Sequence, residues 1–159
     1  MYACDLVEPR AVVLAVASAW VAPAEVPSRI ASLFDIVYGW LGDSGLQQRG
    51  DNHALYAMTE DGLRMRVGVP VSEAFTDTEA VGCVQLDVAR AAHTVHRGEY
   101  AGLLEAHRAL RRWASAQTLT TGPLSWEVYG DWSDDPARLR TDVFIELIGA
   151  DDFGEAPPG

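Results

Sequence analysis

Hydrophobic positions in the first half of the chain change their spacing in a way that predicts one strand, one helix and two more strands. Residues 11–20 are a run rich in valine and alanine, which is typical of a buried strand. From Pro27 or the serine after it, apolar residues recur every three or four positions, which indicates an amphipathic helix ended by a glycine. Residues 53–59 and 63–71 are then predicted to be two strands, joined by a Glu-Asp-Gly turn of the hairpin type.

The second half of the chain repeats this order of elements. Residues 81–88 and 91–97 have extended patterns and are predicted to be strands. Residues 99–116 carry apolar side chains at helical spacing, and strands are expected at 124–132 and 140–148. Each half therefore has the order strand–helix–strand–strand.

Matching aromatic residues support an internal repeat. Trp40 aligns with Trp113, and Tyr56 aligns with Tyr129 at the same offset. The spacing is far longer than the repeat of a solenoid, so we interpret it as a duplication inside one domain. The expected fold class is α+β, with two β-α-β-β repeats packed around a pseudo-twofold axis and a central ligand groove between them.

The chain is predicted to be one domain followed by a short tail. Its 159 residues are the usual length of a single domain. The domain is expected to cover residues 1–150, with repeat one at about 7–71 and repeat two at about 81–148. Residues 151–159 have little apolar content and end in Pro-Pro-Gly, which predicts a disordered tail.

Charge and N-terminal sequence narrow the functional classes. The net charge is −11 and all twelve basic residues are arginine. This argues against direct binding of nucleic acid, which needs a basic face, and favours cationic ligands. The N-terminus lacks a basic signal sequence, and the apolar run at 11–24 is shorter than the about 20 residues of a membrane helix. A cytoplasmic protein without membrane contact is expected, with Cys4 and Cys83 reduced.

The residues around Glu127 carry the clearest chemical signal. Strand alternation places Leu124, Trp126 and Val128 on one face, which we expect to pack against a helix. Glu127 and Tyr129 then lie on the other face. A buried carboxylate is costly unless it is paired. Glu127 is therefore either a solvated residue on an exposed strand face or a site for a cation or proton in the groove.

Aromatic residues are the expected walls of this groove. The position equivalent to Glu127 in the first repeat is Ala54, so only one repeat carries the acid. Tyr56, Trp20 and Phe144 are candidate wall residues, and Trp40 is either a core residue or part of an aromatic cage. Aromatic walls with one acid would suit a flat cationic molecule.

The histidines do not have the spacing of metal ligands. His93 and His96 lie three residues apart on a predicted strand, which places them on opposite faces, while His53 and His107 are isolated. We interpret all four as structural or surface residues. The sequence has no GxSxG nucleophile motif, no phosphate-binding loop and no dinucleotide-binding motif. No metal and no cofactor are expected.

Motifs in the second half resemble those of the GyrI-like small-molecule-binding domains. Residues 90–113 resemble the family's strand–HxG–helix–W signature. Residues 126–129, Trp-Glu-Val-Tyr, together with 139–145, Leu-Arg-Thr-Asp-Val-Phe-Ile, resemble its ending E-x-Y … R-T-E-I-Y-I-P. The resemblance extends from about Val7 to Ile148, in pattern more than in motif over the first half.

The resemblance implies a fold of two β-α-β-β units and a central pocket for hydrophobic, often cationic, aromatic compounds. The family's buried glutamate, the countercharge in the pocket, corresponds to Glu127, and an aromatic residue of its last strand corresponds to Phe144. Glu146 departs from the pattern, because the family usually has proline there. Similar domains are the effector-binding domains of AraC- and MerR-type multidrug-sensing regulators. This chain would be a stand-alone form without the DNA-binding helices.

Three functional hypotheses follow. The first is a binding module for drug or toxin protection or sensing, with Glu127 as counterion and Tyr56, Tyr129, Trp20 and Phe144 as walls. The second, implied by stand-alone relatives, is a hydrolase that opens cyclopropane rings of alkylating natural products. Glu127 would then activate or orient a water, and a tyrosine hydroxyl, from Tyr56 or Tyr129, would bond the developing oxyanion. The third is a DNA gyrase inhibitory protein that acts through its surface.

Overall fold

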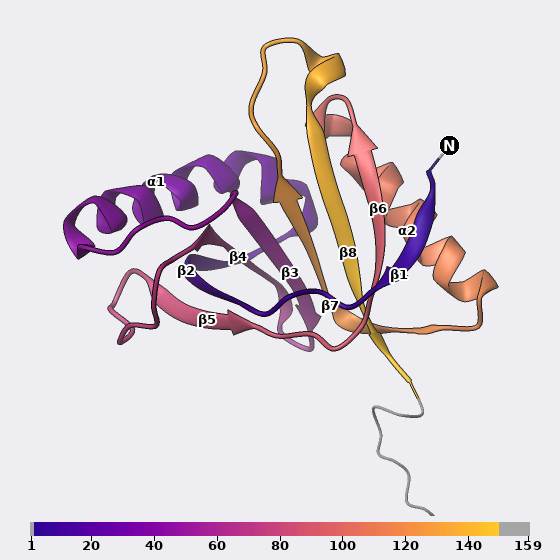
Figure 1. Cartoon of the computed structure of the whole chain (residues 1–159), viewed down its shortest axis with the longest axis horizontal. Helices are drawn as coiled ribbons and strands as arrows, with labels where there is room; N and C mark the ends of the chain where they lie inside the picture. Colours follow the sequence, from indigo (N-terminus) through magenta and orange to yellow (C-terminus); the bar gives the residue numbers. More distant parts are fainter. Residues whose placement is uncertain (1, 150–159) are drawn as a thin grey trace, which may run out of the picture.

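Within residues 2–149, which the computed structural model describes, eight strands form one antiparallel sheet and two α-helices lie on one face of it (Figure 1). The strands are β1 (Cys4–Val7), β2 (Val12–Val21), β3 (His53–Thr59), β4 (Gly62–Pro70), β5 (Gly82–Leu86), β6 (Ala91–Arg97), β7 (Thr120–Tyr129) and β8 (Arg140–Ile148), and the helices are α1 (Val26–Ser44) and α2 (Leu103–Ala116). The expected α+β class is confirmed.

The order of strands across the sheet is the same when it is counted outward from the centre in either direction. The full order is β1-β6-β8-β7-β3-β4-β2-β5, so the central pair β7 and β3 is followed by β8 and β6 on one side and by β4 and β2 on the other. At the centre, Ala54 of β3 lies opposite Glu127 of β7. A twofold axis between β3 and β7 requires that these equivalent residues of the two repeats lie opposite each other. The axis itself stays a prediction.

Each helix packs its own core against the same face of the sheet, which we call the helix face. α1 places Leu33 and Val37 against β2 and β4. α2 buries a stripe at helical spacing made of Leu103, Ala106, Leu110 and Ala114. These two cores share Tyr129, which packs against both. The seam between the helices therefore lies over the end of β7.

Two connecting segments cross the opposite face, which we call the strap face. Residues 8–11 lead from β1 at one edge to β2, and residues 87–90 lead back from β5 to β6 (Figure 1). Val88 in the second segment packs with Leu55 and Trp126 of the sheet, forming a third core. We call residues 8–11 and 87–90 the straps.

The predicted faces of β7 are wrong. Leu124, Trp126 and Val128 were expected to pack against a helix, but they belong to the core on the strap face. The helices cover the face that carries Glu127. The reason is size, because small residues such as Ala54 at the centre of the helix face let a helix approach closely, whereas the large flat Trp126 suits the cover of a thin strap.

Two boundaries also differ from expectation. β1 was not predicted, yet it pairs with β6 over four residues, from Cys4 opposite Thr94 onward. β7 begins at Thr120 and ends at Tyr129, and a register shift follows Thr121. Trp132, expected near the end of this strand, lies in the following loop and is 72% exposed.

The predicted disordered tail, residues 151–159, lies outside the described residues. No helix between Tyr2 and Gly149 is long and apolar enough to cross a bilayer.

Candidate functional site

Glu127 is a buried carboxylate at the centre of the helix face. It lies in the middle of the strand pair β3 and β7, and it is only 4% exposed. Strand alternation turns it toward the seam between α1 and α2, while its neighbour Trp126 points to the strap face. The expected solvated position on an open strand face is thereby excluded, and Glu127 needs partners inside the protein.

Three side chains donate hydrogen bonds to Glu127. The hydroxyl groups of Tyr56 and Tyr129 both donate to Oε1, with a distance of 3.2 Å for Tyr56. Nε2 of His107 in α2 donates to Oε2 at 2.7 Å. Among the ion pairs within residues 2–149, His107 is the only cationic partner of this carboxylate. The ion-pair partner of Glu127 is therefore an imidazole, and not the guanidinium of an arginine.

The two tyrosines act as proton-bearing donors. Burial raises the pKa of Tyr56, and the charge of Glu127 raises it further. Burial and the same carboxylate also raise the pKa of Tyr129 well above the ordinary value. Both hydroxyl groups therefore stay protonated across the physiological range and remain hydrogen-bond donors to Glu127.

Aromatic rings surround this polar cluster. The ring of His107 meets Tyr56 edge-on, with centroids 6.4 Å apart. Tyr100, in the turn before α2, meets Tyr129 edge-on at 5.6 Å and is 41% exposed. Aromatic rings therefore extend from the buried cluster to the protein surface at Tyr100.

His107 is a site residue that the sequence analysis missed. It was interpreted as structural or surface, since no ligand-type spacing connects it to Glu127. A usable signal existed, because His107 lies within the apolar stripe that α2 turns toward the sheet, between Leu103 and Leu110. A histidine in such a stripe requires a buried polar partner.

The structure brings together only part of the predicted site. Glu127, Tyr56 and Tyr129 converge, whereas the other three candidates lie elsewhere. Phe144 is on the strap face, because residues opposite each other on neighbouring strands share a face, and it stacks on Trp126 at a centroid distance of 4.9 Å. Trp20 lies near the end of β2 and is 53% exposed.

Trp40 also lies away from Glu127. It packs against Phe75, with ring centroids 4.6 Å apart, so it belongs to the core under α1. Glu146, the departure from the family pattern, has a structural role instead. Its Oε1 accepts the backbone N–H of Leu124 at 3.2 Å, beside the register shift in β7.

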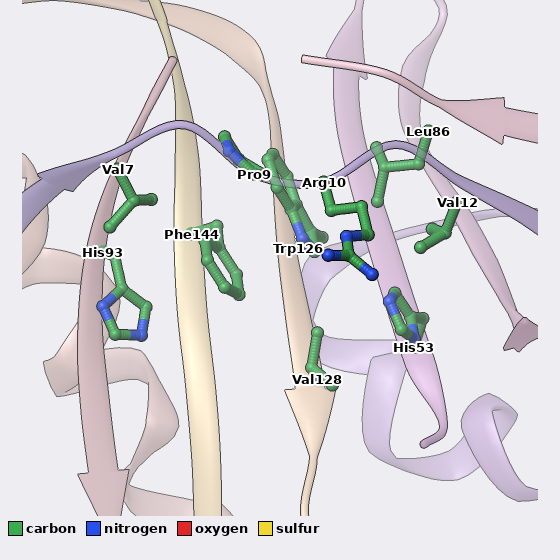
Figure 2. A pocket seen from close by; sticks show the side chains of 10 residues that line it. All are labelled: Val7, Pro9, Arg10, Val12, His53, Leu86, His93, Trp126, Val128 and Phe144. Atoms are coloured by element: carbon green, nitrogen blue, oxygen red, sulfur yellow. The ribbon is translucent and has the colours of Figure 1, made fainter. Parts of the chain in front are cut away.

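A cavity of about 340 Å³ lies on the strap face (Figure 2). Its walls come from the first strap and from seven strands of the sheet, and they include Arg10, His53, His93, Trp126, Val128 and Phe144. Since Trp126 and Glu127 are neighbours that point to opposite faces of β7, the sheet separates this cavity from the cluster around Glu127.

Comparison with known proteins relates the chain to others by fold and not by sequence. No family model matches the sequence, and no curated protein matches it. Among solved structures, the chain is similar to the EcmrR C-terminal domain, with a TM-score of 0.80 and 15% identity over 93% of this chain and 98% of that one.

Two further structures are similar at lower scores. SAV2435 bound to tetraphenylphosphonium has a TM-score of 0.65 and 13% identity, covering 96% of this chain and 98% of that one. A hydrolase from Listeria innocua has a TM-score of 0.62 and 10% identity, covering 91% of each chain. At these identities the likeness concerns architecture alone. The chain has the α+β fold of the GyrI-like effector-binding domains.

Proposed function

We propose that this protein binds hydrophobic, delocalised cations at Glu127, in the seam between the two helices. One observation carries the proposal, which is that a carboxylate at 4% exposure has the imidazole of His107 as its only ion-pair partner within residues 2–149. Its other two hydrogen-bond partners are neutral tyrosine hydroxyl groups. A cation that enters the seam would be attracted to this carboxylate.

The hydrogen bonds of Glu127 determine the class of cation. Its two oxygens already accept bonds from Tyr56, Tyr129 and His107. A guanidinium or ammonium group carries several N–H donors, whereas only about one of the roughly four acceptor sites of the carboxylate is left. A lipophilic cation without N–H groups needs only proximity to the charge and contact with aromatic faces, each worth up to about 2 kcal/mol when desolvated.

Two further features support the proposal. The net charge of −11 attracts cations at long range. SAV2435, which shares the fold, has been solved with tetraphenylphosphonium, a cation of this class. A role in drug or toxin protection or sensing, and contact with DNA gyrase, stay predictions.

Titration calorimetry with tetraphenylphosphonium tests the proposal. Glu127→Gln keeps the shape of the side chain and removes its charge, so we expect binding to weaken about 30-fold or more, which corresponds to the loss of a buried charge pair at about 2 kcal/mol or above. Glu60→Gln, in the exposed turn between β3 and β4, changes the net charge equally and is the matched control. Equal affinities of the two variants, or no binding by the wild type, would contradict the proposal.

A second candidate function is hydrolysis of strained cyclopropane rings on planar natural products. The observation that favours it is the pair of His107 and Glu127 at 2.7 Å beside the protonated hydroxyl of Tyr56. Water would bond to a ring carbon and give its proton to Glu127. The breaking carbon–carbon bond would send its electron pair to a conjugated carbonyl oxygen, which Tyr56 would stabilise.

Mass spectrometry of products from a duocarmycin-type cyclopropane compound separates the two functions. Hydrolysis predicts a water adduct formed over many turnovers by the wild type and by Glu60→Gln, but not by Glu127→Gln. Unchanged compound that co-elutes with the wild-type protein would leave binding as the function of the site.

A further inference from the structure

The cavity on the strap face has the size and lining of a small-molecule site. Its volume of about 340 Å³ falls in the range of ligand pockets. Trp126 and Phe144, stacked within 9° of parallel, and Val128 give it apolar walls, while the first strap closes one side (Figure 2). These walls require a ligand that is mostly apolar.

Arg10 gives the cavity an uncompensated positive charge. Its side chain extends from the first strap toward His53 (Figure 2). It makes no hydrogen bond or ion pair with any residue between Tyr2 and Gly149. The guanidinium fork matches the two oxygens of a carboxylate, which it binds through two parallel hydrogen bonds.

His53 adds an acceptor next to this charge. The residue is 7% exposed, and its Nδ1 lies 2.8 Å from the backbone oxygen of Asp51. Because a carbonyl oxygen only accepts, Nδ1 carries the proton. Burial lowers the pKa of the ring, which is therefore neutral. Nε2 then holds a lone pair, has no hydrogen-bond partner within the described residues, and is available to a donor in the cavity.

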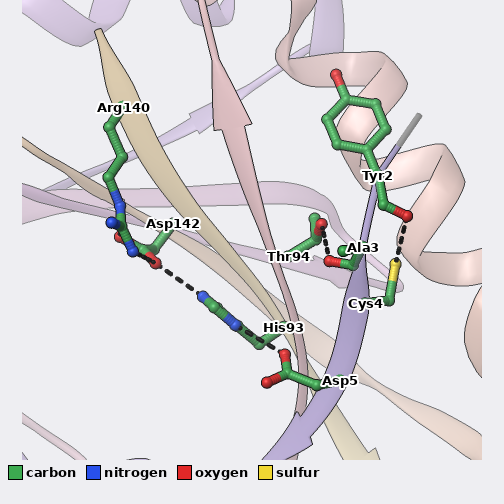
Figure 3. Close-up of polar contacts among 8 residues, drawn as sticks. All are labelled: Tyr2, Ala3, Cys4, Asp5, His93, Thr94, Arg140 and Asp142. Carbon is green, nitrogen blue, oxygen red and sulfur yellow. Dashed lines mark hydrogen bonds and ion pairs between the residues drawn. The ribbon is translucent and has the colours of Figure 1, made fainter. Parts of the chain in front are cut away.

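Two acidic residues next to His93 already have cationic partners. His93 lies between Asp5, at 2.9 Å, and Asp142, at 2.7 Å (Figure 3). Arg140 also pairs with Asp142, at 3.2 Å. Neither carboxylate pairs with Arg10, whose guanidinium is therefore left to a ligand in the cavity.

We propose that this cavity is a second binding site, for planar aromatic carboxylates that carry an N–H or O–H donor next to the acid group. Arg10 binds the carboxylate, Nε2 of His53 accepts the adjacent donor, and the aromatic ring contacts Trp126, Val128 and Phe144. The site is independent of the cation site, because it lies across the sheet from Glu127 and takes a ligand of opposite charge.

Indole-2-carboxylate is the probe, since its ring N–H is adjacent to its carboxylate. We expect the wild type to bind it and to bind two close analogues at least about 10-fold more weakly, as the loss of one charge-assisted hydrogen bond predicts. Benzofuran-2-carboxylate places an oxygen lone pair against the lone pair of His53, and indole-2-carboxamide lacks the charge that Arg10 binds. Equal affinity for all three compounds would overturn the proposal.

Variants locate the site. Arg10→Gln should weaken binding of indole-2-carboxylate at least about 10-fold, whereas Arg29→Gln, at a half-buried arginine on α1 with the same charge change, should not. Glu127→Gln should bind the probe like the wild type. The proposal for the cavity can therefore fail while the cation proposal stands, and the cation proposal can fail while the proposal for the cavity stands.

Nuclear magnetic resonance provides a second measurement on the same samples. The indole N–H signal of Trp126, assigned with Trp126→Phe, should shift on addition of the probe. Equal loss in Arg10→Gln and Arg29→Gln, shifts confined to Tyr56 and Tyr129, or no binding at millimolar concentration would each overturn the site.

Discussion

Two histidines in this protein have carboxylate partners that are remote in the sequence, and the two pairs differ in their balance of charge. His107 shares one carboxylate, Glu127, with two tyrosines. His93 instead lies between Asp5 and Asp142, which are 88 and 49 residues away. The first arrangement has one imidazole for one buried carboxylate, at the place where we propose that a cation binds. The second is balanced internally and ties the edge strand β1 to β8.

The two ion pairs of His93, with Asp5 and with Asp142, predict a pH-dependent contribution to the free energy of unfolding. The hydrogen bond to Asp142 raises the pKa of His93 in the folded protein. The stabilisation from His93 is therefore complete below the ordinary histidine pKa of about 6.5, and it is lost as the pH rises through the pKa of the folded state. Burial alone would raise the pKa of Asp142, but hydrogen bonds from His93 and Arg140 lower it. That contribution is present above about pH 4 and is lost on acidification.

We therefore expect His93→Asn to lower the free energy of unfolding by up to about 1 kcal/mol between about pH 4 and 6.5, a small value because the groups are partly exposed. Urea denaturation at a series of pH values measures this. Asp5→Asn, which removes only the more exposed partner, should give a smaller loss. If the difference in free energy of unfolding between His93→Asn and the wild type grew above pH 8, the ion pairs of His93 would not be its cause.

At the scale of the elements, the sequence predicted most of the helices and strands, but not which segments cover each face of the sheet. Periodicity predicted α1, α2 and seven of the eight strands, because each pattern follows from local side-chain alternation. It also placed Glu127 and Tyr129 on one face of β7. It could not tell which face the helices cover, since the straps that bury Trp126 are irregular segments from elsewhere in the chain. β1 was missed because its pairing partner lies far away in sequence.

A close approach between β2 and β4 has no signal in the sequence either. Gly68 of β4 lies opposite Val16 of β2, and a Cβ built at this glycine would sit 1.8 Å from the backbone oxygen of Ala15. No atom fits at that distance without movement of the backbone. The glycine is thus required by the packing of two neighbouring strands.

We expect Gly68→Ala to destabilise the protein by at least about 1–3 kcal/mol, as overpacking of a core does. Gly39→Ala is the matched control, because a Cβ there meets nothing within 4 Å on α1. This control should gain about 0.5–1 kcal/mol through helix propensity. Thermal unfolding followed by circular dichroism compares the two variants, and equal melting temperatures would show that β2 and β4 separate at low cost.

At the scale of the whole molecule, the two proposed ligand sites have opposite charge preferences and lie on opposite faces of β7. Glu127 offers a negative charge between the helices, and Arg10 offers a positive one under the first strap. The net charge of −11 favours the cation at long range and opposes the aromatic acid. Occupation of the second site therefore depends on local contacts, with the apolar walls at Trp126 and Phe144 contributing most of the affinity.

The pairing of β1 with β6 also sets the order in which the chain acquires its structure during synthesis. The oxygen of Ala3 accepts a hydrogen bond from Thr94, 91 residues later. At a rate of about 5–20 residues per second, the N-terminal strand waits roughly 5 to 20 seconds after it is made before its partner exists. Over that interval β2, α1, β3 and β4 have left the ribosome, but Leu14 and Leu55 still lack their cover. The nascent chain therefore exposes an apolar sheet face until β6 emerges and β1, with the first strap, closes it.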